Sequence, residues 1–261
     1  MAQYQVNAQP SSKRGLGWPW NNTAPEFANY NPAISSGKIT WLFNWEMWKP
    51  DSTPDDIEYI PQVRVGSQAS QIDQFLSSIP KDKLNYFMTF NEPEIPSQAN
   101  MSVAETVALW KQYVLPAKEK FGFQLGSPGM SSDPKGKAWL QDFLAALGGN
   151  DGIDFVVVHW YGTDMPQLAS FMGEIYDTFK KPLWLTEFAY TTMRTDQPAT
   201  VGQVQEFMRQ AIPFLGECEF VERYAYFGAM KSVGDWVGEA NCLHDKEGAG
   251  LTSAGKVYSE L

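Results

Sequence analysis

The sequence has few residues of the kinds that hold metals, nucleotides or disulfide frameworks. Its 261 residues include two cysteines and two histidines, with no His-Glu-x-x-His and no Cys-x-x-Cys motif. Metal sites built from these ligands need such spacings, so we expect no metal. A phosphate loop, a Gly-x-Gly-x-x-Gly turn after a strand and a Gly-x-Ser-x-Gly elbow are also absent. We therefore expect no cofactor and no serine-hydrolase chemistry.

The sequence also lacks an excess of basic over acidic residues, and it has no long apolar runs. Twenty Lys and Arg against 30 Asp and Glu give a net charge of −10, which argues against a nucleic-acid partner. The longest apolar runs, such as Phe155–Val158, are strand-sized, whereas a membrane helix needs about 20 residues. The start at Met1 has no basic and apolar signal regions, so an exported protein would already have lost its signal. Glycosylation motifs at Asn21 and Asn100 are compatible with secretion, and we expect an extracellular or cell-wall location.

The two cysteines, Cys218 and Cys242, both lie in the last quarter of the chain. A disulfide between them would close a short loop and stabilise the fold by about 3 kcal/mol. We expect this bridge, although two unpaired buried thiols are the alternative.

Short apolar runs alternate with amphipathic stretches along the whole chain. The predicted strands are Arg14–Gly17, Ile39–Asn44, Tyr59–Val65, Tyr86–Asn91, Gln124–Gly126, Phe155–His159, Leu183–Glu187 and Arg223–Phe227. The predicted helices are Ala24–Ser36, Gln68–Ile79, Val103–Phe121, Lys135–Leu147, Met165–Phe179, Val201–Leu215 and Ala254–Leu261. Alternation of this kind favours parallel strands, because each crossover needs a dozen or more residues.

Eight such units without a linker or a change in composition predict one domain over residues 1–261, an α/β fold of the (β/α)8 or TIM-barrel type. The second unit is the least regular, since Pro50–Ile57 is short for a full helix. In such barrels the function gathers at the carboxyl ends of the strands.

Polar and aromatic side chains follow nearly every predicted strand. They include Trp18 and Trp20 after the first, Asn44, Trp45 and Glu46 after the second, Asn91, Glu92 and Glu94 after the fourth, His159, Trp160 and Tyr161 after the sixth, Glu187 and Tyr190 after the seventh, and Phe227 and Trp236 after the eighth. Sugars suit such a rim, because they offer hydroxyl groups at their edges and C–H faces for stacking.

Two carboxylates stand out among these residues. Glu92 follows the apolar strand that begins at Tyr86, and Glu187 shares a face with Leu183 and Leu185 by the alternation of a strand. If the leucines fill a barrel, Glu187 points inward at its mouth, with Glu92 nearly opposite. Such a pair can cleave a glycosidic bond, one carboxyl group protonating the leaving oxygen while the other attacks or directs water.

These blocks resemble a known family. The segments Lys13-Arg14-Gly15-Leu16-Gly17-Trp18-Pro19, Phe90-Asn91-Glu92-Pro93-Glu94, Val158-His159-Trp160-Tyr161 and Leu185-Thr186-Glu187-Phe188 occur in order along nearly the whole chain. Together with Phe43-Asn44-Trp45-Glu46, they resemble glycoside hydrolase family 128, the fungal β-1,3-glucanases with an Asl1-like catalytic domain. The resemblance implies a retaining barrel hydrolase that acts on β-1,3-glucan by double displacement, with endo action expected and a monomer as the expected state.

The resemblance also implies roles for individual residues. Glu92 is expected to be the general acid/base and Glu187 the nucleophile, with Asn91 hydrogen-bonded to the substrate 2-hydroxyl. Tyr161 would orient Glu187, while His159 is either a rim residue or a satisfied core histidine. Retention requires carboxyl groups about 5–5.5 Å apart, whereas inversion needs about 6.5–9.5 Å.

The remaining rim residues are candidates for substrate binding. The aromatic ones, expected to be sugar platforms or packing anchors, are Trp18, Trp20, Trp45, Trp160, Tyr190, Phe227 and Trp236. Asn44, Glu46 and Glu94 are expected beside the catalytic pair. Trp41, Trp139 and Trp184 are expected in the core.

Two other functions stay open from the sequence. A non-catalytic glucan-binding or cell-wall protein could keep the cleft without the reaction, although it would not need two facing carboxylates. A barrel hydrolase for another β-linked polysaccharide, such as mannan or a β-1,4-glucan, has the same composition.

Overall fold

The computed structural model describes residues 12–51, 53–149 and 151–261. The residues considered for a removed signal, at the start of the chain, lie outside this part. The described strands are β1 (Arg14–Gly17), β2 (Trp41–Phe43), β3 (Glu58–Tyr59), β4 (Tyr86–Phe87), β5 (Gln124–Leu125), β6 (Val156–Gly162), β7 (Leu183–Tyr190) and β8 (Val221–Tyr226). Each predicted strand is present, although several are shorter or longer than expected.

The helices lie between these strands, as the alternation predicts. They are α1 (Ala24–Ala28), α2 (Asn31–Ser35), α3 (Ile72–Ser77), α4 (Val103–Leu109), α5 (Leu115–Phe121), α6 (Pro134–Leu147), α7 (Met165–Phe179), α8 (Val201–Glu217) and α9 (Ser253–Glu260). Among the described residues, no helix is long and apolar enough to cross a membrane.

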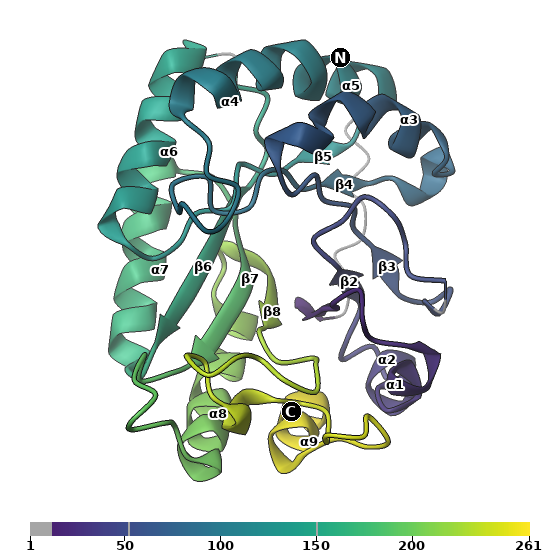
Figure 1. Cartoon of the computed structure of the whole chain (residues 1–261), viewed down its shortest axis with the longest axis vertical. Coiled ribbons are helices and arrows are strands. Elements are labelled where there is room, and N and C mark those ends of the chain that lie inside the picture. The colour runs from purple at the N-terminus through teal and green to yellow at the C-terminus, as the bar shows by residue number, and fades with distance from the viewer. Residues whose placement is uncertain (1–11, 52, 150) are drawn as a thin grey trace.

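The strand ladders are parallel and form two sheets. One has the order β3-β2-β1-β8-β7-β6, and the other pairs β4 with β5. Single-residue parallel bridges join the two sheets, between Gln62 and Met88 on one side and between Gly126 and Phe155 on the other. The strands thus occupy the middle of the molecule with the helices outside them (Figure 1).

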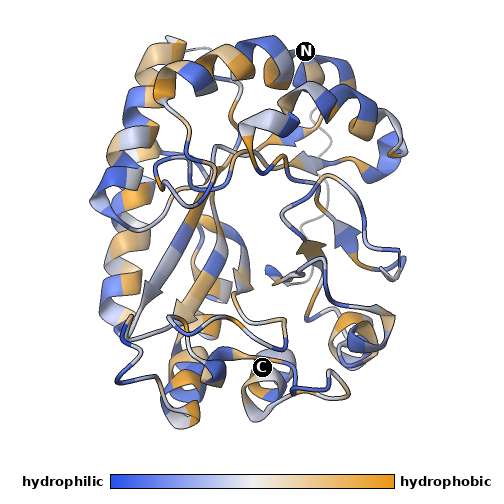
Figure 2. Cartoon of the chain, in the orientation of Figure 1, coloured by the Kyte–Doolittle hydropathy of each residue, from blue (hydrophilic) through white to orange (hydrophobic). Residues whose placement is uncertain are grey.

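Two groups of buried side chains hold this arrangement together. Alternate strand residues pack against one another, among them Trp41, Phe155 and Trp184. The other group lies between strands and helices, where the apolar stripes of α6 and α7 alternate with polar ones (Figure 2). The expected core positions of Trp41 and Trp184 are confirmed, since both are fully buried. A Cβ at Gly15 would come within 2.2 Å of the Trp41 ring, so glycine makes room for this indole.

Two predicted helices are interrupted at proline. The segment predicted as Val103–Phe121 holds a π-helical turn at Trp110–Val114 between α4 and α5. Pro116 follows this turn and lacks the N–H that would continue the regular ladder, which accounts for the irregularity. Similarly, the predicted helix Ala24–Ser36 splits into α1 and α2, with Pro32 at the start of α2.

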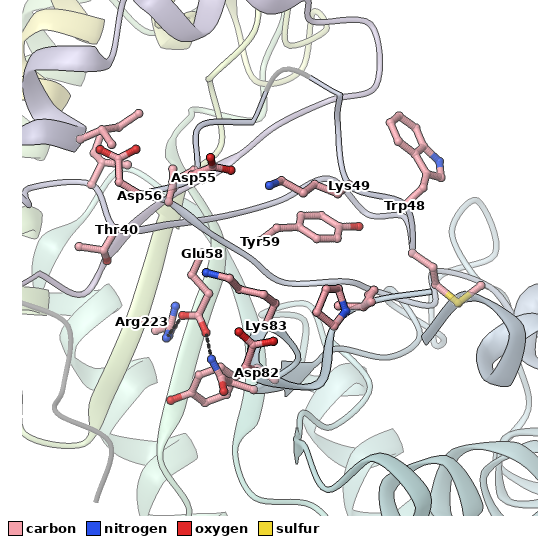
Figure 3. Close-up of a pocket in the computed structure, with 18 of the residues that line it drawn as sticks. Thr40, Trp48, Lys49, Asp55, Asp56, Glu58, Tyr59, Asp82, Lys83 and Arg223 are labelled. Carbon is pink, nitrogen blue, oxygen red and sulfur yellow. Dashed lines mark hydrogen bonds and ion pairs between the residues drawn. The ribbon is translucent and has the colours of Figure 1, made fainter. Parts of the chain in front are cut away.

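The connection between β2 and β3 contains no helix among its described residues. In its place, a hollow of about 1120 Å³ lies outside these strands, bordered by α2, α3 and the β2–β3 loop. Figure 3 shows its lining, including Trp48, Tyr59 and the ion pair between Glu58 and Arg223.

The expected disulfide is absent, since both cysteines are free thiols. Cys218 ends α8 just before β8 begins, and its carbonyl oxygen accepts a hydrogen bond from Lys13, before β1. Cys242 lies beyond the other end of β8. The backbone N–H of its neighbour Leu243 donates a hydrogen bond to the carbonyl oxygen of Gly228, which follows that end of the strand. A bridge needs Cα atoms within about 7 Å, and a six-residue strand separates the two thiols by more than that.

Candidate active site

Glu92 and Glu187 face each other, together with His159. Carboxylate oxygens of the two acids and a ring nitrogen of His159 all lie within 4.8 Å of one another. Glu187 comes from β7, His159 from the adjacent β6, and Glu92 from the segment after β4. All three are buried, with the two glutamates each 6% exposed. The strand alternation that predicted an inward Glu187 thus matches this geometry.

Glu187 accepts a hydrogen bond at each carboxylate oxygen. The indole N–H of Trp45 donates to Oε1 at 2.7 Å, and the Tyr161 hydroxyl donates to Oε2 at 2.7 Å. Burial raises the pKa of Glu187, and the nearby charge of Glu92 raises it further. The His159 cation and these two hydrogen bonds lower the pKa and oppose that effect. The carboxylate is therefore fixed in place by groups that favour its charged form.

His159 bridges the two acids. Its Nδ1 lies 2.7 Å from Oε1 of Glu92 and 3.6 Å from Oε2 of Glu187. Burial lowers the pKa of His159, but the charges of Glu187 and Glu92 outweigh it and raise the pKa to about 9. The imidazole ring is therefore a cation at neutral pH. This charge distinguishes His159 from the uncharged core histidine that was the alternative.

The backbone is strained at two of these positions. Glu92 has φ 46° and Trp45 has φ 58°, in the left-handed region that side chains other than glycine rarely occupy. Two backbone hydrogen bonds hold the segment after β4. The N–H of Glu92 donates to the carbonyl oxygen of Gly129, and the carbonyl oxygen of Glu92 accepts from the N–H of Ile95. Strained residues of this kind gather at functional sites.

The carboxylates open into a cleft of about 700 Å³. Tyr161 within β6 and Glu187 within β7 contribute to its lining, and the other residues lie after every strand except β6. The full lining comprises Pro19, Trp20, Asn44, Trp45, Glu46, Arg64, Asn91, Glu92, Ile95, Ser97, Gln98, Ser131, Ser132, Asp133, Tyr161, Glu187, Met193, Phe227, Met230 and Trp236. Trp20 and Trp236 are 74% and 44% exposed, so their rings are available to a ligand. Tyr161 packs edge-on against Trp236 with ring centres 4.8 Å apart.

Among the predicted polar residues, Asn91 is the one best placed for a substrate hydroxyl. It is buried beside Glu92, and its Oδ1 has no hydrogen-bond partner among the described residues. Asn44 and Glu46 line the cleft, with Glu46 hydrogen-bonded to Gln68 at 2.9 Å. Glu94 does not line it, because its Oε1 turns to the backbone N–H of Ser131.

Three predicted sugar platforms lie elsewhere. Trp18 is 1% exposed and stacks on Phe27 with ring centres 3.9 Å apart, so it anchors α1. Trp160 is also buried and stacks on Phe207 of α8, because it points away from the face that carries its two neighbours in β6. Tyr190 borders a separate small hollow beside α8. The sugar-platform expectation is therefore wrong for these three residues, whereas the alternative of a packing anchor fits Trp18 and Trp160.

Several residues of the cleft were not predicted. Arg64, Gln98, Ser131, Asp133, Met193 and Met230 line it and lie on irregular segments after strands. Arg64 lies 3.4 Å from Glu46, which places an ion pair in the wall. No periodic pattern marks such loop residues. Distance from the strand end could have found Met193 after β7 and Met230 after β8.

The spacing of Glu92, His159 and Glu187 is also that of metal ligands. A protonated imidazole, however, has no lone pair to offer. Both oxygens of Glu187 are already engaged by N–H and O–H donors. The cluster is therefore better suited to share a proton than to bind a metal ion. The expected lack of a metal stays a prediction.

Comparison with known proteins decides the family. A family model described as "Glycosyl hydrolase catalytic core" matches residues 15–258. The chain belongs to this family. It is 31% identical over 253 residues to Alkali-sensitive linkage protein 1 of Schizosaccharomyces pombe, covering 95% of this chain but 44% of that protein. The chain therefore spans less than half the length of that relative.

Solved structures agree with this assignment. A family 128, subgroup II endo-β-1,3-glucanase from Sorangium cellulosum has a TM-score of 0.78 and 26% identity, covering 95% of this chain and 97% of that one. A curdlan-specific exo-β-1,3-glucanase of subgroup III from Blastomyces gilchristii, in complex with glucose, has a TM-score of 0.78 and 27% identity, covering 95% and 98%. The predicted resemblance to glycoside hydrolase family 128 is confirmed, and the solved structures similar to this chain include both endo and exo enzymes.

Proposed function

We propose that this chain hydrolyses β-1,3-glucan with retention of anomeric configuration, with Glu187 as nucleophile and Glu92 as acid/base. The observation that carries the proposal is the separation of the two acids, whose nearest oxygens lie within 4.8 Å. Retaining enzymes place their carboxyl groups about 5–5.5 Å apart, whereas inverting enzymes leave room for a water between them.

In the first step, an oxygen of Glu187 attacks the anomeric carbon and forms the glycosyl ester. The glycosidic C–O bond breaks, and Glu92 gives its proton to the departing sugar oxygen. The free Oδ1 of Asn91 accepts a hydrogen bond from the 2-hydroxyl, an interaction that strengthens in the transition state.

In the second step, water takes the place of the leaving sugar. Glu92, now ionised, removes a proton from this water as it attacks the anomeric carbon. The ester bond breaks and Glu187 leaves as a carboxylate, stabilised by the donors Trp45 and Tyr161. The cycle ends with Glu92 protonated.

In this cycle, His159 holds the proton that Glu92 needs as an acid. Its Nδ1 lies at hydrogen-bond distance from Glu92, and its pKa is about 9. The proton that the pair shares can therefore reside on His159 before substrate binds and move to Glu92 when the leaving oxygen needs it. In this form the cluster carries one negative charge in total, which limits the cost of burying it.

The glucan substrate and its mode of cleavage rest on the cleft and on the relatives. Two relatives of known structure are β-1,3-glucanases, one endo and one exo. We propose endo cleavage here because residues after β1 to β5 and after β7 and β8 all line the cleft, which is consistent with a groove that extends across the strand ends. The bridges between the two sheets likewise support a closed (β/α)8 barrel. We further propose secretion to the cell wall.

A laminarin digest tests the function. We expect new reducing ends, a rapid fall in viscosity and a ladder of oligosaccharides, as internal cleavage requires. The variants Glu92→Gln and Glu187→Gln should lose this activity while still binding glucan. A parallel digest of mannan and of β-1,4-glucan tests the linkage. Binding of laminarin by the wild-type chain without hydrolysis would instead make it a glucan-binding protein.

A further inference from the structure

Tyr59 lies outside the catalytic cleft but contacts its wall. Its ring lines the hollow beside β2 and β3 (Figure 3), and the residue is 8% exposed. Its hydroxyl group lies 2.7 Å from the carbonyl oxygen of Glu46 and 3.1 Å from Oδ1 of Asn44. The ring therefore belongs to one cavity, while the hydroxyl group binds residues of the other.

The two residues that Tyr59 holds flank Trp45. Asn44 also donates to the carbonyl of Trp48 at 2.9 Å and accepts from the backbone N–H of Glu46 at 3.2 Å. This network closes the tight turn in which Trp45 has its left-handed backbone, with φ 58°. A strained residue keeps such a conformation only while its surroundings enforce it.

Trp45 in turn touches the proposed nucleophile. Its indole N–H donates to Oε1 of Glu187 at 2.7 Å, and its ring packs on Phe43 with ring centres 4.7 Å apart. The position of the indole follows from the turn, and the turn follows from its hydrogen bonds. A continuous series of contacts thus runs from the Tyr59 hydroxyl to the carboxylate.

We infer that Tyr59 is a positioning residue for catalysis, which aims the Trp45 indole at Glu187 by fixing the turn at residues 44–46. The inference rests on the proposed role of Glu187. Tyr59 does not itself line the cleft, so its effect is on the charge state and orientation of the proposed nucleophile and not on glucan binding.

This role predicts a specific change in pH dependence. The hydrogen bond from Trp45 favours the ionised form and lowers the pKa of Glu187. Without the Tyr59 hydroxyl, the turn relaxes and that bond weakens. The pKa of Glu187 then rises, and the acid limb of kcat/KM moves to higher pH.

The test is Tyr59→Phe, which keeps the ring and removes the hydroxyl group. We expect kcat to fall about tenfold near neutral pH, because a hydrogen bond to a charged group is weakened, with KM for laminarin unchanged. The acid limb should move upward by a measurable fraction of a pH unit. Its position does not depend on enzyme concentration, so partial unfolding of the variant does not mimic it.

Tyr86→Phe is the matched control. Tyr86 lines the same hollow, and its hydroxyl group has no hydrogen-bond partner among the described residues. We expect this variant to keep the wild-type profile. Trp45→Phe should move the acid limb at least as far as Tyr59→Phe does, and the double variant should match Trp45→Phe alone.

Two results would overturn the inference. One is a Tyr59→Phe profile that coincides with those of the wild type and Tyr86→Phe, and the other is full additivity with Trp45→Phe. The control Glu187→Gln separates this from failure of the proposed function. If Glu187→Gln is inactive while Tyr59→Phe is normal, only the positioning role fails. If Glu187→Gln keeps its activity, the proposed mechanism fails.

Discussion

Nδ1 of His159 lies 2.7 Å from a carboxylate oxygen of Glu92 and 3.6 Å from one of Glu187, so a single imidazole faces both acids. It is the cation nearest to either carboxylate among the described ion pairs. The proton balance of the cluster therefore depends on this ring, and so should the pH range of the proposed hydrolysis.

Replacing His159 by Gln should narrow that range from both sides. The His159 cation lowers the pKa of Glu187, so its loss raises that pKa and moves the acid limb of kcat/KM to higher pH. The alkaline limb, which we expect near the His159 pKa of about 9, should move to lower pH because the imidazole no longer holds the proton. Full pH profiles of both proteins on laminarin measure this. Unchanged limbs would contradict the role.

Tyr161→Phe should reduce kcat by about 10- to 100-fold, because it removes a hydrogen bond to the charged form of Glu187, the proposed nucleophile. KM should change little. Tyr176→Phe on α7 is the control, since its hydroxyl group has no hydrogen-bond partner among the described residues. Equal kinetics for the two variants would show that the Tyr161 hydroxyl is dispensable.

Two neighbouring tryptophans should behave in opposite ways. Trp20 is 74% exposed at the cleft, so Trp20→Ala should raise KM for long glucans about three- to tenfold and leave stability unchanged. Trp18 is buried against Phe27 and Tyr30, so Trp18→Ala should cost about 3–5 kcal/mol of unfolding free energy. Denaturant unfolding and laminarin kinetics of both variants test this contrast. The reverse pattern would contradict the structural role of Trp18 and the substrate-binding role of Trp20.

His244 should limit stability in acid. It is buried between Trp18 and Tyr30, and burial lowers its pKa from 6.5 to about 4, although Glu26 opposes this. The unfolded chain therefore binds a proton that the folded chain does not, and stability falls as pH drops from 6.5 to 4. The loss approaches about 3 kcal/mol, at 1.36 kcal/mol for each pH unit.

The measurement is unfolding free energy against pH for the wild type and His244→Phe. The variant has no ring to protonate, so its curve should be flatter between pH 6.5 and 4. Parallel curves would assign the acid loss to other groups, such as the Glu26–Lys231 ion pair.

The sequence predicted the order of strands and helices because apolar periodicity is a local property. Strand alternation placed Glu187 and Leu185 on one face, and the predicted position of Glu92 after the fourth strand brought it to the same end of the strands. Helix breaks at Pro32 and Pro116 could have been read from the same sequence, since proline cannot continue a regular ladder.

Side-chain direction in loops was not predictable in this way. Trp18, Trp20 and Trp45 all follow strands, yet one is buried, one is exposed and one points at Glu187. Which of these occurs depends on turn geometry and on distant partners such as Phe27 and Tyr59. The disulfide prediction failed for a similar reason, because closeness in the sequence hid an intervening strand.

The anomeric form of the first product tests the central claim most directly. Proton NMR of laminarin hydrolysis, followed from the first seconds, distinguishes the two anomers before they interconvert. The account predicts that the β-anomer appears first and the α-anomer only later by mutarotation, as double displacement at Glu187 requires. Initial release of the α-anomer would mean a single displacement by water and would contradict the roles assigned to Glu187 and Glu92.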